Sequence, residues 1–315
     1  MLAPRERRAQ QTGGLRASRI GFVALLGCAA LGVGIAAWRI HAGHEFFDQR
    51  KLLSRFPAED ALALSVDFTT LRAAGLLSVP KAALEPDYRQ FVEGTGFDYR
   101  RDLDSLTASF SRSGTFFIAR GHFDWKKLRG YAVRQGGSCY QDLCRMQGSK
   151  PERHISFLPL RNDAIALAVS ANDLAATMLT KTGPPVTANI PSAPVWLSVP
   201  GSELRKQDAL PPGMHLMLSA LTSADRVIIT IGPAGSGIEA HLEATCRTKD
   251  DAKVLASQLR ITTSTLKEAL QHDKQAGEDE LAALLTAGSF NQTDRRVTGT
   301  WPVRRSLLDA ITEGI

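Results

Sequence analysis

Hydrophobic and polar residues follow three patterns along this 315-residue chain, and each predicts a different kind of element. The first is a run of 19 uncharged residues, 20–38, which as a helix rising ~1.5 Å per residue reaches across a hydrocarbon core of ~30 Å. The second, 39–56, mixes aromatic and aliphatic residues with charged ones, as an amphipathic helix at a membrane surface does. From residue 57 onward, short stretches of hydrophobic and polar alternation predict strands, and helical periods lie between them.

The alternating stretches predict a coarse order of elements. Strands are expected at 62–68, 105–111, 115–119, 154–158, 164–169, 214–221, 227–231, 238–246 and 297–301. Helices are expected to start after the capping residues Asp124, Ser170 or Asn172, and Thr248, and a last helix is expected over 303–311.

Two parts of the chain resemble each other on either side of a Pro-rich linker, 184–194, in which helix and central strand are both disfavoured. The word Leu-Ser-Val, four residues, Leu-Arg occurs at 64–72 and again at 197–205, and each copy leads into a hairpin and then a helix. The sequence therefore predicts an α+β fold with two related halves, 57–183 and 195–315. Each half is expected to be a mainly antiparallel sheet with helices packed on one face.

The charges around the uncharged run predict its orientation. Five arginines and one glutamate precede residues 20–38, so residues 1–19 are expected in the cytoplasm and the C-terminal domain in the periplasm of a bacterium, with one transmembrane helix in the inner membrane. Two alternatives are a cleaved secretory signal and a lipoprotein, because Leu25–Cys28 resembles a lipobox with Cys28 as the acylated residue. The apolar run continues for ten residues past Cys28, which favours an uncut signal anchor.

Small residues recur every four positions within the transmembrane segment, at Ala24, Cys28, Gly32 and Ala36. Such spacing lets two helices approach closely, so a homodimer through this helix is one interpretation. The other is that an Ala- and Gly-rich segment produces the spacing through composition alone, and this interpretation is favoured.

The net charge of +6 comes almost entirely from the targeting region. Residues 1–44 carry six arginines and one acidic residue, which leaves 32 basic and 31 acidic residues in the remainder. Nor does the remainder contain a run of Lys or Arg interleaved with aromatic residues, so nucleic acid is not expected as a partner.

The cysteines predict one disulfide. Cys139 and Cys144 are separated by four residues, which lets them face each other across a tight hairpin in an oxidising compartment. A metal half-site is the alternative, but no second pair of cysteines or histidines at ligand spacing completes it. Cys246 shares a predicted strand face with hydrophobic residues and is expected to be buried.

One set of motifs follows the order found in penicillin-recognising enzymes: Ser78 to Lys81, Ser170 to Asn172, and Lys181 to Gly183. Pro80 makes the helical turn that this chemistry requires doubtful, and the third motif follows the second too closely. Gly183, before two prolines, is better interpreted as a helix C-cap.

Two further sets could hold a cation. Glu239, His241 and Glu243 alternate onto one face of a strand, and Asp102 and Asp104 form a DxD. A solvated face and turn caps with ion pairs are the favoured interpretations. No nucleophile elbow, zinc-protease motif, Walker loop or dinucleotide fingerprint occurs in the sequence, so no catalytic, cofactor-binding or metal-binding residue is predicted.

Several words of the sequence resemble a group of uncharacterised bacterial proteins with one amino-terminal membrane helix and an exported domain. These words are 56–58, 66–68, 71–76, 95–104, 121–124, the Cys139/Cys144 loop, 155–157 and 166–169. The resemblance covers mainly residues 56–180. It implies the single-pass topology and a structural role for the cysteine loop, but no activity.

Three hypotheses about function remain. The leading one is a non-enzymatic envelope protein that binds a protein, glycan or lipid partner or acts as a scaffold. An envelope hydrolase or transferase would need a deep pocket with converging titratable groups. A lipid-handling domain would need an apolar cavity between the helices and the sheet.

Overall fold

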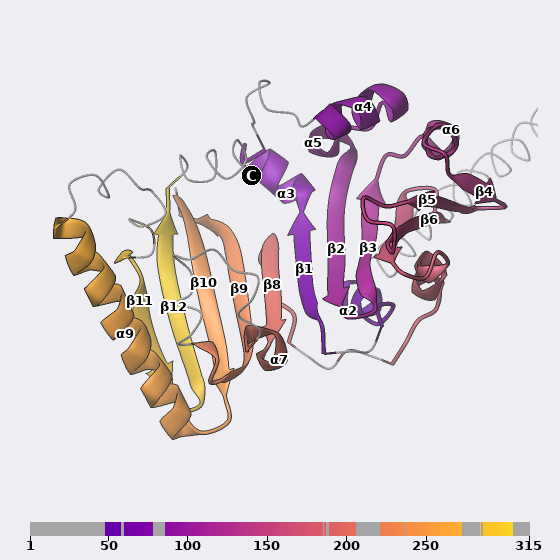
Figure 1. Cartoon of the computed structure of the whole chain (residues 1–315). Helices are drawn as coiled ribbons and strands as arrows, with labels where there is room; N and C mark the ends of the chain where they lie inside the picture. Colours follow the sequence, from indigo (N-terminus) through magenta and orange to yellow (C-terminus); the bar gives the residue numbers. More distant parts are fainter. Residues whose placement is uncertain are drawn as a thin grey trace, which may run out of the picture. The chain divides into compact units, whose positions relative to one another are not determined.

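A computed structural model describes residues 48–57, 60–77, 86–184, 186, 189–205, 221–235, 237–272, 284 and 286–304 (Figure 1). The predicted transmembrane helix 20–38, the first half of the segment 39–56, the predicted elements over 214–220 and 305–311, and the residues Ser78 and Lys81 lie outside these ranges. Within the described ranges, the helices are too short or too polar to span a membrane. The chain divides into two compact units, Met1–Lys51 and Leu52–Ile315.

The described residues of the second unit form one twelve-stranded sheet in which all neighbours are antiparallel (Figure 1). The strands are β1 Leu62–Asp67, β2 Leu103–Ser111, β3 Gly114–Gly121, β4 Ser138–Tyr140, β5 Leu143–Gln147, β6 His154–Arg161, β7 Ala164–Ser170, β8 Val195–Pro200, β9 Ala224–Ala234, β10 Gly237–Cys246, β11 Ser289–Thr293 and β12 Arg296–Val303. Their spatial order is β11-β12-β10-β9-β8-β1-β2-β3-β7-β6-β5-β4. The α+β class and the antiparallel pairing are thus confirmed, whereas the separate sheets expected for residues 57–183 and 195–315 are one continuous sheet, because β1 pairs with β8.

The helices of the described ranges differ greatly in length. They are α2 Gln49–Leu53, α3 Phe68–Ala73, α4 Pro86–Thr95, α5 Tyr99–Asp102, α6 Trp125–Arg134, α7 Gly201–Leu204, α9 Lys249–His272 and the 3₁₀ helix η1 Ala175–Thr180. Two predicted starts are confirmed by their caps. Asp124 Oδ1 accepts a hydrogen bond of 3.0 Å from the Lys127 amide, and Thr248 and Asp251 form a capping box with bonds of 3.0 and 3.2 Å.

The strand register places alternate hydrophobic residues on one face, here called the helix face because α6 and α9 cover it. Leu64 and Leu197 pair at the centre of this face. Under α9, the fully buried Leu255 and Leu259 pack on Val227, Ala244 and Val297. Under α6, a second buried cluster contains Leu128, Ala132, Ala119, Phe157 and Ile165. These two clusters of the hydrophobic core therefore lie on the same side of the sheet.

The opposite face of the sheet is also covered, which corrects the expectation that helices pack on one face only. Ser156 alternates to this face, and its Oγ accepts a hydrogen bond of 3.1 Å from the Ala176 amide of η1. The segment after α2 joins the same layer, because the Gly183 amide donates to the Ser54 carbonyl at 2.6 Å. The physical reason is that Ala164, Ala166 and Ala168 of β7 are fully buried on this face and need a cover.

The strands follow the same order on both sides of the central pair β1–β8. Outward from β1 the order is β1-β2-β3-β7-β6, and outward from β8 it is β8-β9-β10-β12-β11. In each series a helix, α6 or α9, follows the third strand along the chain. The first series continues with β5 and β4 at its edge.

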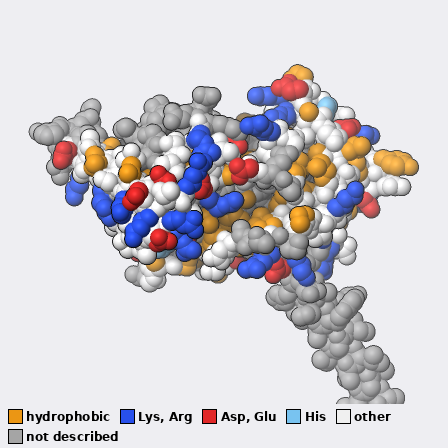
Figure 2. Space-filling view, turned by 90° about the horizontal axis from the view of Figure 1, so that it is seen from below, with side chains coloured by type: hydrophobic (Ala, Val, Ile, Leu, Met, Phe, Trp, Pro, Cys, Tyr) orange, Lys and Arg blue, Asp and Glu red, His pale blue; other side chains and the backbone are white. Residues whose placement is uncertain are grey.

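Seen from below, hydrophobic side chains gather in the middle of the molecule and Lys and Arg side chains lie around them (Figure 2). Several hydrophobic residues of the central strands are only partly buried, among them Leu62, Leu64 and Val66 of β1. Phe110 at the end of β2 is 36% exposed and lies against Phe117, with 6.1 Å between the ring centroids. The apolar surface of the sheet is thus not fully covered by the described helices.

Candidate apolar binding site

A cavity of about 410 Å³ lies between α4, α6 and the helix face of the first strand series. Its floor is formed by side chains of β3, β5, β6 and β7, namely Ala119, Met146, Ile155, Phe157, Ile165 and Leu167. Its walls and roof are formed by Phe91, Phe97, Leu103, Phe123, Leu128 and Tyr131. All of these lining residues are hydrophobic or aromatic.

The floor follows from the strand register. Ile165 pairs with Ala119, Leu167 pairs with Phe157, and Ile155 pairs with Met146, so their side chains share the helix face. Ala119 contributes only a methyl group at the position where β3 meets β7. A small residue between large neighbours leaves room above it, which the helices do not fill.

The roof is a cluster of aromatic rings held at preferred geometries. Phe91 of α4 meets Tyr131 of α6 edge to face, with ring centroids 5.3 Å apart and an interplanar angle of 89°. Phe97 and Phe123 are stacked at 5.3 Å and 14°. The two helices approach closely at Gly94, where a Cβ atom would lie 2.8 Å from the Tyr131 ring. The aromatic rings, not the helix backbones, therefore set the height of the roof.

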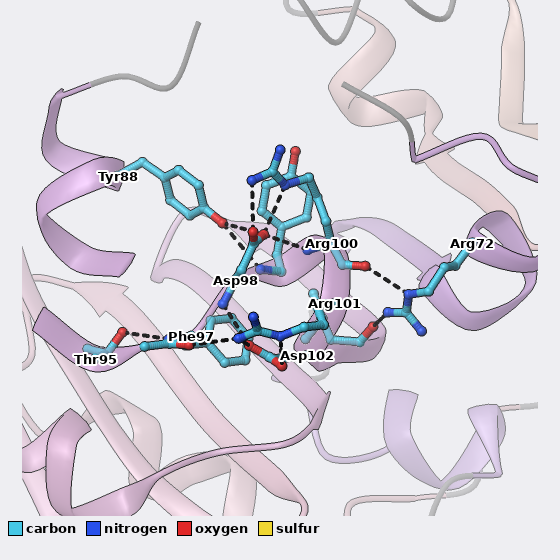
Figure 3. A network of polar contacts seen from close by, with 11 residues as sticks. Arg72, Tyr88, Thr95, Phe97, Asp98, Arg100, Arg101 and Asp102 are labelled. Atoms are coloured by element: carbon cyan, nitrogen blue, oxygen red, sulfur yellow. Dashed lines mark hydrogen bonds and ion pairs between the residues drawn. The ribbon is translucent and has the colours of Figure 1, made fainter. Parts of the chain in front are cut away.

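Asp98 fixes the segment that carries Phe97, between α4 and α5 (Figure 3). Its carboxylate accepts hydrogen bonds from the Arg100 amide at 3.0 Å, from Arg100 Nη2 at 2.8 Å and from Tyr88 Oη at 3.1 Å. The Tyr88 hydroxyl in turn accepts from the Tyr99 amide at 3.2 Å. Phe97 donates its amide to Thr95 Oγ1 at 3.2 Å. A local polar network thus holds the segment that places Phe97 in the roof of the cavity.

A second carboxylate completes this network. Asp102 Oδ2 accepts from the Asp98 amide at 2.8 Å, and Arg101 binds both oxygens of Asp102 at 2.8 Å. Arg101 also donates to the Gly96 carbonyl at 3.0 Å. Arg72 connects the network to α3 by donating to the carbonyls of Arg100 and Leu103 at 2.8 and 2.6 Å. Asp102, part of the DxD sequence, is thus engaged in a cap and an ion pair.

The network shifts the pKa values of its members. The hydrogen bonds from Arg100 hold the pKa of Asp98 below its usual value, and the bonds from Arg101 do the same for the pKa of Asp102. Burial is the main cause that raises the pKa of Tyr88 to about 12. Both carboxylates are therefore ionised and Tyr88 is protonated at neutral pH, as hydrogen bonding in the network requires.

Two other hollows are present in the described part of the chain. One, of about 460 Å³, lies beside the apolar cavity and is lined by Arg101, Asp102, Asp124, Lys127 and Asp163 among others. The other, of about 380 Å³, lies on the opposite face of the sheet, where Trp196, Arg226 and Glu243 contribute both apolar and charged surface. The apolar cavity differs from both in having no charged lining residue.

The three cysteines of the described ranges lie as the sequence predicts. Cys139 and Cys144 form a disulfide between β4 and β5, at the edge of the sheet next to α6. Cys246 is a buried free thiol under α9. The disulfide hairpin thus supports β5, which supplies Met146 to the cavity floor.

The other sequence motifs do not form a site among the described residues. Ser170 Oγ donates to the Ser113 carbonyl at 2.7 Å and accepts from the Asn172 amide at 3.2 Å, which is a structural role. His241 Nε2 lies 3.2 Å from Glu239 Oε2, whereas Glu243 pairs with Arg296 at 3.6 Å. In the part of the chain that the structure describes, no three His, Cys, Asp or Glu residues are arranged to hold a metal ion.

Comparisons with known proteins give only a distant likeness. The chain matches no protein-family model and no curated protein. It is similar to the solved structure of TP0453 in crystal form I, with a TM-score of 0.47 and 10% identity over 83% of this chain and 96% of that chain. Crystal forms III and IV of TP0453 give TM-scores of 0.44 and 0.43 at 8% and 9% identity, over 82% of this chain and 97% and 96% of theirs. At this similarity the likeness carries no inference about function.

Proposed function

We propose that this chain is a bacterial membrane-anchored envelope protein whose folded domain binds an acyl chain or a similar apolar group in the cavity under α4 and α6. The cavity carries the proposal, because about 410 Å³ lined only by hydrophobic side chains lies within the ~300–1,000 Å³ typical of ligand sites. Protein interiors are otherwise close-packed. Each methylene group that leaves water for such a cavity contributes ~0.8 kcal/mol.

The chemistry around the cavity favours binding over hydrolysis or group transfer. Tyr131 is the single titratable residue among those that line the cavity. The neighbouring groups with shifted pKa values, Asp98 and Asp102, direct their oxygens toward arginines and backbone amides of their own segment. Converging acid and base groups, which an enzyme would need, are not found in this lining.

The proposed relation between the two halves explains why only one of them would bind a ligand. The shared strand order and the pairing of Leu64 with Leu197 support a duplication about the β1–β8 pair. In the second half, the 24-residue α9 inserts Leu255 and Leu259 between itself and the sheet. In the first half, the 10-residue α6 contributes Leu128 and Ala132, and the cavity takes up the remaining space.

The placement of this domain at a membrane is part of the proposal and rests on the sequence alone. The uncharged segment 20–38 and the arginines before it support an anchor in the inner membrane with the domain on the periplasmic side. A domain tethered there would meet acyl chains at the membrane surface. The anchor and the cavity are therefore compatible with one role.

The test is a binding assay on the full chain held in an amphipathic polymer, with cis-parinaric acid as fluorescent probe. Ile155→Trp fills part of the cavity from its floor and takes up the volume of about two methylene groups of the ligand. The probe should therefore bind about tenfold more weakly. Ile261→Trp is the matched control, because Ile261 is 61% exposed on α9. Equal affinity of both variants and the unchanged chain, or no saturable binding at all, would contradict the proposed function.

A further inference from the structure

We infer that the ligand is a single-chain amphiphile with a zwitterionic head group, and that the head group binds in the polar hollow beside the apolar cavity. This inference rests on the proposed function and names the ligand class of the same site. Its basis is that the apolar cavity and the polar hollow share one wall. The apolar cavity measures about 410 Å³ and the polar hollow about 460 Å³.

The shared wall consists of Phe97 and Phe123, which line both volumes. Their rings stack at 5.3 Å and 14°. Both residues lie in connecting segments, Phe97 between α4 and α5 and Phe123 between β3 and α6. A change in two side-chain rotamers would therefore join the cavity to the hollow without breaking a helix or the sheet. One molecule could then occupy both.

The hollow presents charges of both signs. Lys127 contributes an amine that lies 3.7 Å from Asp124 Oδ2, a separation longer than a hydrogen bond. Its Nζ also lies 3.3 Å from the position that a Cβ on Gly96 would occupy, so the side chain reaches toward the α4–α5 segment. Asp163 carries the opposite charge and lies 3.6 and 3.4 Å from Arg120 and Arg161.

This mixture selects the head group. A purely anionic head would bring its charge next to Asp124 and Asp163, and a purely cationic head would do so next to Lys127 and Arg101. A head with a phosphate and a quaternary ammonium group can direct the phosphate to Lys127 and the ammonium group to the carboxylates. Because Lys127 is 58% exposed, each such contact contributes modestly, and the preference for a zwitterion is expected to be about fivefold.

The experiment compares four probes with the same twelve-carbon chain as competitors of cis-parinaric acid on the full chain, each below its micelle concentration or, for the alcohol, below its solubility limit. They are dodecylphosphocholine, dodecanoate, dodecyltrimethylammonium and dodecanol. Dodecylphosphocholine is expected to displace the fluorescent probe at about fivefold lower concentration than the other three. In the variant Lys127→Gln this preference should disappear, while displacement by dodecanol stays unchanged.

The matched control is Lys253→Gln on α9. Lys253 is also 58% exposed and pairs with an aspartate three residues earlier, Asp250, but it lies far from the hollow in sequence and on another helix. If all four probes compete equally and Lys127→Gln changes nothing, the head-group inference is wrong while the apolar site stands. If no probe competes and Ile155→Trp has no effect, the proposed function fails, and the inference fails with it.

Discussion

Removing the carboxylate of Asp98 tests whether the polar network holds the roof of the cavity. Asp98→Ala deletes the cap of α5, the bonds from Arg100 and the bond from Tyr88. The side chains of Asp98 and Arg100 are 19% and 23% exposed, so their pair is worth more than a surface pair but less than a buried one. The loss of a helix cap lowers the free energy of unfolding by ~1 kcal/mol, and the loss of a hydrogen bond lowers it by a further ~1 kcal/mol. We expect the free energy of unfolding to fall by ~3 kcal/mol.

The assay is urea unfolding of the full chain at neutral pH, followed by circular dichroism, together with binding of cis-parinaric acid under native conditions. Since Phe97 is positioned by this segment, the variant should also bind the probe several-fold more weakly. Asp142→Ala is the control, because Asp142 is 77% exposed and lies 3.8 Å from Arg129. Its loss should change the free energy of unfolding by less than ~0.5 kcal/mol. A change in Asp98→Ala no larger than in this control would refute the assigned role.

Three further predictions concern titration and thiols. Because the folded-state pKa of Asp98 is lowered, the ionised carboxylate stabilises the fold above the unfolded pKa of ~3.9, and this stabilisation is lost as the pH falls through the folded pKa. The difference in unfolding free energy between the unchanged chain and Asp98→Asn should therefore shrink below about pH 4. A difference that stays constant with pH would contradict this. The double variant Cys139→Ala/Cys144→Ala should lose ~2 kcal/mol of unfolding free energy, and a reductant should destabilise the unchanged chain but not this variant. Burial raises the pKa of the Cys246 thiol, so in a Cys28→Ser background Cys246 should react with a thiol reagent at pH 8 much more slowly in the folded than in the urea-unfolded chain; equal rates would show that the thiol is accessible.

Sequence patterns predicted the elements whose signals are local. The capping box at Thr248 and Asp251 and the cap at Asp124 mark α9 and α6, and alternation marks most of the long strands. Helix α4 was not predicted, although Pro86 at its first position and Asp87 in its first turn are start signals. The hydrophobic stripe of α4 is short, and Gly94 weakens the helix signal because glycine has a low helix propensity. The structure shows why a glycine is present, since it packs closely against Tyr131.

The segment 95–104, which carried part of the family resemblance, has a clear structural role. Its residues Asp98, Arg100, Arg101 and Asp102 satisfy one another and the surrounding amides. From sequence, these charges indicated turn caps and ion pairs. That they hold a phenylalanine above an apolar cavity could not be predicted, because Phe97 meets Phe123 and Phe91 only in the folded chain.

The cavity itself has no counterpart in the sequence pattern, and a comparison of the two strand series on either side of the β1–β8 pair shows why. Hydrophobic residues alternate in the same way in β3 and β7 as in β10 and β12, whether a helix side chain fills the space above them or not. The difference arises from the partner layer, in which α9 inserts the fully buried Leu255 and Leu259 and α6 is less than half as long. A hydrophobic strand face thus specifies burial, but the helix that crosses it decides whether protein side chains fill the space above the face or leave a cavity.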